Sequence, residues 1–114
     1  MIHTSEIIEV FQVDEGEWIA KTHIIFFSSK GKQNEVCGDV STYCSFNSIT
    51  KAIDALLDTL NESGVILRDK FSLAYSYMGI KDQDNPPVNE NWKEIIIGEA
   101  ESRGWEAFVE GQIY

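Results

Sequence analysis

The sequence predicts a single α+β domain over residues 1–114, a mostly antiparallel sheet with two helices on one face, in the order β-β-β-α-β-α-β. Strand-length segments rich in β-branched and aromatic residues fill the first 46 positions and are separated by polar turns. Two later segments carry helical apolar periodicity and helix-capping residues. The length of 114 residues fits one domain that forms a core without disulfides or metal.

The N-terminal part predicts three strands, at residues 5–13, 18–28 and 35–46. Residues 14–17 predict a hairpin turn, because Gly16 tolerates the positive φ that such a turn requires. Residues 24–27 are apolar on both faces, which is typical of a central strand.

A helix is predicted after the third strand, because apolar residues recur there at helical spacing. Asn47 or Ser48 is expected to cap its start and Gly64 to end it. The apolar stripe consists of Ile49, Ala52, Ile53, Leu56, Leu57 and Leu60.

Residues 70–78 predict a fourth strand, since Phe71 and Leu73 alternate with small polar residues. Residues 79–89 predict a loop, because the Pro86-Pro87 pair there interrupts both helices and strands.

A second helix is expected to begin at Asn89 or Asn91, with Glu94 in the capping-box position relative to Asn91. Gly104 is expected to end this helix. Residues 105–111 then predict a last strand.

Two helices on one face leave the other face of the sheet without a cover. We expect Ile25, Phe27 and Tyr43 to lie there. A second subunit in a homodimer, another protein or a small ligand would then cover them.

Cys37 and Cys44 are the only cysteines of the chain. In one straight strand they would lie about 23 Å apart, at roughly 3.3 Å per residue, which is too far for a disulfide. Both are therefore expected to be free thiols.

The net charge of −10 and the pI of about 4.5 exclude some partners and favour others. An acidic surface repels nucleic acid and anionic membranes, and it attracts a basic protein. No apolar run approaches the roughly 18 residues that cross a membrane, and the N-terminus does not resemble a signal peptide. A soluble, cytoplasmic protein is expected.

Residue patterns for catalysis, metals and cofactors are absent. His3 and His23 belong to no metal-ligand motif, and in the Asp82/Asp84 segment Pro87 occupies the position where a calcium loop requires glycine. Neither glycine-rich nucleotide-binding motif occurs. We therefore predict no catalytic, cofactor-binding or metal-binding residues, and no cofactor.

Glu99 and Arg103 lie on the same side of the second predicted helix as Trp92 and Ile96. Their i, i+4 spacing is that of a helical ion pair, and Arg103 is close to the C-terminal end, where positive charge is favoured. The pair is interpreted as a partly exposed structural pair at the end of the helix.

The acidic residues are concentrated in the C-terminal third. Residues 79–114 hold eight acids and three bases, whereas residues 1–78 hold eleven acids and six bases. A carboxylate patch that binds a basic protein is predicted at Asp82, Asp84, Glu94 and Glu101.

The first half of the chain resembles the arrangement of HicB-type antitoxins. The matching features are an acidic-Gly turn before an aromatic residue at 14–18, then Gly38 and a polar segment that leads into the helix at Ser48. This resemblance implies an antitoxin-type role.

These observations favour a small acidic non-enzymatic binding protein, of the immunity or antitoxin type, that inhibits a basic protein partner. Two alternatives stay open. One is a self-associating or small-ligand-binding domain that uses the apolar sheet face, and the other is an enzyme whose site has no recognisable sequence motif.

Overall fold

A computed structural model describes residues 2–14, 16–27, 33–42, 44–75, 91–109 and 112–113 of the chain. These ranges form a mixed sheet and two helices, so the α+β class is confirmed. The elements are β1 (Ile2–Asp14), β2 (Glu17–Phe27), β3 (Gln33–Ser41), α1 (Ile49–Glu62), β4 (Ser72–Tyr75), α2 (Trp92–Arg103), β5 (Glu106–Val109) and the two-residue β6 (Gln112–Ile113).

The first three strands form an antiparallel meander. Gly16 adopts φ 72° between β1 and β2, as the predicted turn requires. The third strand is shorter than predicted. It ends at Ser41, although the Thr42 N–H still donates to the Ala20 carbonyl of β2 at 3.0 Å, and Phe46 exchanges two backbone hydrogen bonds of 2.7 and 2.9 Å with Trp18.

The sheet is mixed, and the prediction of a mostly antiparallel sheet was wrong. Its strand order is β3-β2-β1-β4-β5-β6, and both the β1/β4 and the β4/β5 pairs are parallel. The reason is that α1 and α2 carry the chain back along the sheet before the next strand begins, and such crossovers produce parallel neighbours. The predicted element order also lacked β6, which pairs antiparallel with β5.

Helix α1 confirms the expected capping and apolar stripe. The Ser48 hydroxyl accepts a hydrogen bond of 3.1 Å from the Lys51 backbone N–H. The stripe residues are buried except Leu57, which is half-buried. Burial of this stripe therefore fixes which side of α1 faces the sheet.

Helix α2 begins after Asn91 and ends before Gly104, as predicted, but its N-cap lacks the expected side-chain hydrogen bond. Gly104 ends it at φ 72° in the left-handed region. Asn91 occupies the N-cap position, yet its side chain makes no capping hydrogen bond. The other predicted cap, Asn89, and the predicted loop at 79–89 lie outside the described residues.

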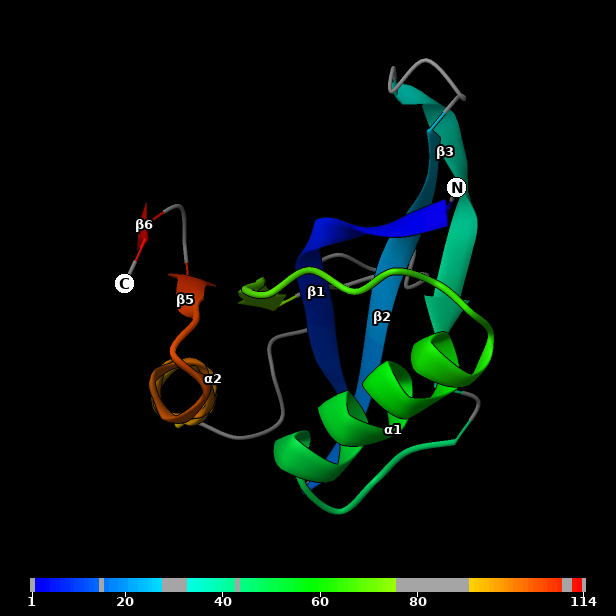
Figure 1. Cartoon of the computed structure of the whole chain (residues 1–114). Helices are drawn as coiled ribbons and strands as arrows, with labels where there is room; N and C mark the ends of the chain where they lie inside the picture. Colours follow the sequence, from blue (N-terminus) through cyan, green and yellow to red (C-terminus); the bar gives the residue numbers. More distant parts are fainter. Residues whose placement is uncertain are drawn as a thin grey trace.

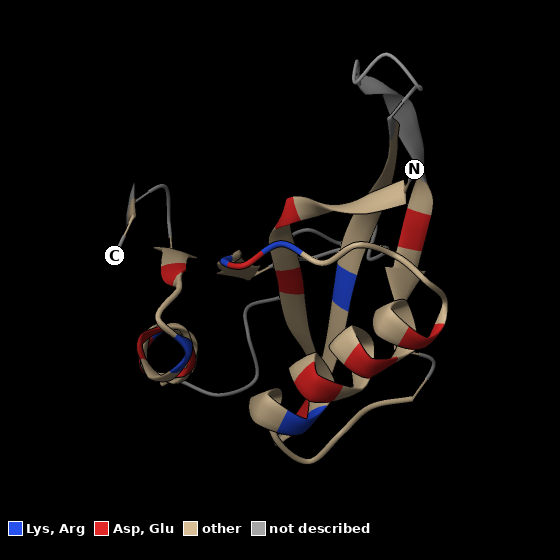
Figure 2. Cartoon of the chain, viewed as in Figure 1, with Lys and Arg blue, Asp and Glu red and all other residues tan. Residues whose placement is uncertain are grey.

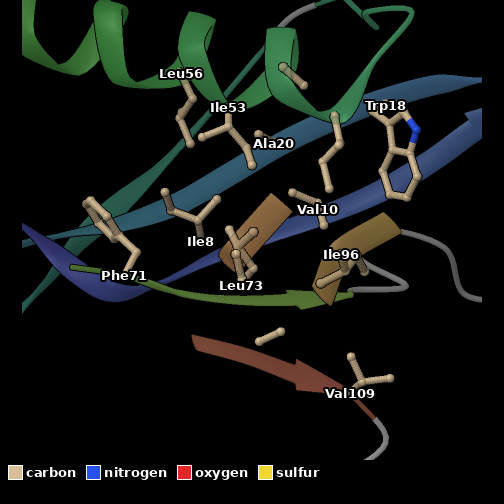
Figure 3. Close-up of a cluster of buried hydrophobic side chains, with 14 of the residues drawn as sticks. Ile8, Val10, Trp18, Ala20, Ile53, Leu56, Phe71, Leu73, Ile96 and Val109 are labelled. Atoms are coloured by element: carbon tan, nitrogen blue, oxygen red, sulfur yellow. The ribbon is translucent and has the colours of Figure 1, made fainter. Parts of the chain in front are cut away.

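Both helices pack on the same face of the sheet and share one hydrophobic core (Figures 1 and 3). Helix α1 packs on β2 and β3, and α2 packs on β4 and β5. Figure 3 shows Ile53 and Leu56 of α1 reaching toward Ile8, Val10 and Ala20 of the sheet. The opposite face receives no helix from the described ranges.

Neither helix in the described ranges has the length and apolar character of a membrane-spanning segment. Cys44 is a free, exposed thiol beyond the end of β3, so the assumption that one straight strand carries both cysteines does not hold.

Candidate functional site

The face of the sheet opposite the helices, called the open face below, carries several large exposed apolar side chains. Along β1 the residues Ile8 and Val10 enter the core, so the alternation of a strand places Ile7 on the open face, whereas Val13 lies at a register shift near the end of the strand. Ile7 is 45% exposed and Val13 48%. On β5 and β6, Phe108 is 44% exposed and Ile113 67%.

The strand register makes the open face continuous across the sheet. Phe108 pairs with Ile113 on one side and with Ala74 on the other, and Ala74 pairs in turn with Glu9 of β1. Directly paired residues share a face, so these side chains form one row across β1, β4, β5 and β6. Next to this row lies Ile7, whose Cα partner on β4 is Ser72.

The β2 and β3 side of the open face is polar. Lys21 Nζ lies 3.0 Å from Asp39 Oδ2, and His23 Nδ1 contacts the other oxygen of the same carboxylate. The hydrogen bond from Lys21 lowers the pKa of Asp39, burial opposes this, and the contact with His23 lowers it further. The Asp39 charge is therefore compensated within the protein.

Glu9, near the centre of the same face, is less well compensated. Its Oε2 atom is buried and has no hydrogen-bond partner in the part of the chain that the structure describes. Lys21 is its cross-strand neighbour but pairs with Asp39 instead. A buried carboxylate oxygen without a donor costs free energy.

Of the residues predicted on the uncovered face, Ile25 is the one whose side chain belongs to the described part of the chain. Ile25 is 9% exposed and needs no cover. The side chains of Phe27 and Tyr43 lie outside the described residues. Ile7 and Phe108 were not predicted on this face, although their alternation with buried Ile8 and Val109 is visible in the sequence.

The Glu99–Arg103 pair is more buried and more connected than predicted. The Glu99 side chain is 8% exposed, and its two oxygens accept hydrogen bonds of 2.5 Å each from Thr50 Oγ1 and Arg103 Nε. Arg103 Nη2 also lies 2.7 Å from Asp54 Oδ1 and donates to the Thr50 carbonyl at 3.3 Å. The cluster thus joins α2 to α1, and the interpretation as a partly exposed pair within one helix was wrong.

Arg103 is held in its charged form by this cluster. Burial acts to lower its pKa, but the hydrogen bonds with Asp54 and Glu99 outweigh burial, and the net shift is upward. The guanidinium also lies 5.2 Å from the Trp105 ring centroid. Each charge is matched inside the fold, so the cluster is a structural connection between the helices.

The predicted acidic patch is described only in part. Glu94 and Glu101 are exposed, and their separation of seven residues places them on one side of α2. Asp82 and Asp84 lie outside the described residues. Helix α1 adds exposed Asp54, Asp58 and Glu62 on successive turns, which Figure 2 shows in red.

Within the described ranges, no three His, Cys, Asp or Glu side chains gather closely enough to hold a metal ion. His23 contacts Asp39, an arrangement that orients an imidazole ring. No pocket with a nucleophile or an oxyanion site accompanies this pair among the described residues. The open face is accordingly the strongest candidate site.

The fold and this site define an α+β domain with a mixed sheet, helices on one face and an apolar surface on the other. Comparisons with models of protein families, with curated protein sequences and with solved structures found no match. The resemblance to HicB-type antitoxins therefore gains no support from them.

Proposed function

We propose that this protein is a small non-enzymatic binding protein that recognises a basic protein through the open face of its sheet. The observation that carries the proposal is the set of three large apolar side chains, Ile7, Phe108 and Ile113, each 44–67% exposed, on the face that no described helix covers. Contiguous exposed apolar surface of this kind marks interaction sites in soluble proteins.

The apolar residues would supply the affinity. Complete burial of an exposed Ile, Val or Phe side chain stabilises by roughly 1.5–3 kcal/mol. The residues of the open face are about half exposed in the free protein, so each would contribute about 1 kcal/mol in a complex. Burial of Ile7 and Phe108 in an interface would therefore contribute measurably to the binding free energy.

The charges would select the partner. The net charge of −10 attracts a basic surface from a distance. Glu94 and Glu101 project from α2, away from the sheet that α2 covers. Their role in the proposal is long-range steering rather than direct contact.

An inhibitor or immunity-type role follows from the same properties, because an acidic, apolar surface without catalytic groups acts by masking its target. A second copy of this chain is the competing occupant of the open face. Two copies, each of net charge −10, repel one another, which favours a basic partner over a homodimer.

Affinity capture from a lysate of the native host tests the proposal. The immobilised wild-type protein is compared with Phe108→Lys and Ile7→Lys, which place a charge in the open face. Ile66→Lys is the matched control, because Ile66 is 40% exposed but lies in the segment after α1. We expect a basic protein that the wild type and the control retain and both open-face variants lose.

Binding between this protein and the captured basic protein must then be measured directly with both proteins purified. Light scattering of the isolated chain tests the homodimer, which would disappear in Phe108→Lys. If the isolated chain forms such a dimer and no basic partner is captured, the proposal is wrong and the open face serves self-association. Equal capture of the partner by all variants would refute the open face as the binding surface.

A further inference from the structure

A charged pocket lies at the N-terminal ends of β4 and β5, at the border of the open face. It has a volume of about 400 Å³ and opens to solvent, and its wall includes Glu6, Arg68, Lys70, Trp105 and Glu106. The volume falls in the range typical of small-molecule sites. Two cations and two carboxylates therefore line one small space in an otherwise acidic protein.

The backbone brings these residues together. The Glu106 N–H donates to the Phe71 carbonyl at 3.4 Å, which joins the start of β5 to the segment before β4. Ser72, at the start of β4, pairs with Glu106 in the sheet. Glu6 comes from the irregular part of β1, between the register positions Thr4 and Ile8.

The charges of the pocket are incompletely matched. Arg68 Nη1 lies 3.5 Å from Glu6 Oε1, a weak exposed contact. Among the described residues, neither Lys70 nor Glu106 has an ion-pair partner, and they do not pair with one another. One ammonium group and one carboxylate without an ion-pair partner among the described residues thus line the same space.

One wall of the pocket is rigid and aromatic. The Trp105 ring packs edge-on against Phe71 at 5.1 Å between centroids, and Arg103 lies over it at 5.2 Å. Phe71 belongs to the core, and Arg103 is held by α1 and α2. Trp105 is therefore a preformed surface for the carbon chain of a small ligand.

We propose that this pocket binds a small zwitterion, an amino acid whose carboxylate meets Lys70 and Arg68 and whose ammonium group meets Glu106. Such a ligand satisfies both unpaired charges at once and adds no net charge. A simple anion would meet Glu6 and Glu106, and a simple cation would meet Lys70 and Arg68, so each single charge is disfavoured. Ser72 and Glu106 lie in the same cross-strand row as Ile7, so the pocket borders the partner surface. The two proposals concern different ligands and are tested by different measurements, so either can fail alone.

Titration with amino acids of increasing chain length tests this inference. Glycine, β-alanine, γ-aminobutyrate and ε-aminocaproate separate the two charges by growing distances. Acetate and methylamine carry one charge each. The readout is the NMR shift of the Trp105 indole N–H, with the indole of Trp18, 2% exposed in the core, as the internal control. We expect saturable shifts at Trp105 with one preferred chain length.

Two variants that each neutralise one charge then test which protein groups bind the ligand. Lys70→Gln and Glu106→Gln should each weaken binding of the preferred zwitterion about fivefold, as for one exposed ion pair. Lys51→Gln and Asp58→Asn remove exposed charges on α1 and should bind as the wild type does. All these positions are exposed, so folding is expected to be preserved.

The inference is overturned by any of three results. The first is that no zwitterion produces a saturable shift at Trp105. The second is that acetate or methylamine alone binds as tightly as the best zwitterion. The third is that Lys70→Gln and Glu106→Gln bind as the wild type does.

Discussion

Replacing Glu99 by glutamine tests the connection between the two helices. The substitution keeps the size of the side chain and removes its charge. In the wild-type protein the two carboxylate oxygens accept from Thr50 on α1 and from Arg103 on α2. The amide has only one accepting oxygen, so one of these donors loses its partner in the variant.

The cost follows from burial and from the contacts that survive. A hydrogen bond to a buried charge contributes about 1.5–3 kcal/mol, and complete loss of a partner for a buried charge costs about 3–5 kcal/mol. Arg103 is 17% exposed and keeps its bond with Asp54 and its contact with the Thr50 carbonyl, so the loss is incomplete. We expect Glu99→Gln to lower the free energy of unfolding by about 2 kcal/mol.

Urea denaturation measures this change, and Tm should fall by about 8 °C for a domain of this size. Glu101→Gln is the matched control, because Glu101 lies on the same helix but is exposed. The control should change the free energy of unfolding by less than about 0.5 kcal/mol. Equal losses in the two variants, both below about 0.5 kcal/mol, would show that the buried cluster does not stabilise the fold.

Four further expectations concern other parts of the molecule. Ser48→Ala should lower the free energy of unfolding by about 1 kcal/mol in urea melts, because it removes the N-cap of α1. The pKa of Asp39 is lowered in the fold, so its contribution to stability is present above the ordinary aspartate pKa and is lost as pH falls through the lowered value. The difference in stability between the wild type and Asp39→Asn should therefore shrink when pH falls below about 4. Thiol titration of the unfolded, unreduced protein should count both cysteines, since Cys44 is free; a count of zero at monomer mass would contradict this. Once a basic partner is known, reversing Glu94 and Glu101 to lysine should slow association at low salt and flatten its salt dependence, and an unchanged rate would exclude steering by α2.

The local elements were predictable because local periodicity specifies them. The stripe of α1 and its Ser48 cap are written in consecutive residues, and so are the Gly16 turn and the Gly104 helix end. Which strands pair with β4 cannot be inferred from the local sequence. Their parallel pairing depends on how two helices return the chain to the sheet, which strand periodicity does not encode.

Burial of Glu99 likewise depends on tertiary packing that the local sequence does not encode. The helical wheel placed Glu99 beside Trp92 and Ile96, toward the core. The i, i+4 spacing and the position of Arg103 near the helix end then favoured a partly exposed pair. The residues that make burial tolerable, Thr50 and Asp54, lie about fifty positions away, and only the packing of α1 on α2 brings them near.

The open face was predictable as a surface but not in its residues. An uncovered face follows from two helices on one side of the sheet. Which residues lie on it depends on the strand register. Phe108 and Ile113 belong to β5 and β6, which are too short to show a clear strand periodicity in the sequence. Ile25 was assigned to this face and is buried.

The most direct test of the open face as the binding surface is the dissociation constant of the purified complex with the captured basic protein. Calorimetry compares the wild type with Phe108→Ala and with Ile66→Ala, which removes an apolar side chain of similar exposure from the segment after α1. Burial of a half-exposed phenylalanine predicts a loss of affinity of about five- to tenfold for Phe108→Ala and no change for Ile66→Ala. An unchanged constant for Phe108→Ala would contradict the proposal that this face forms the interface.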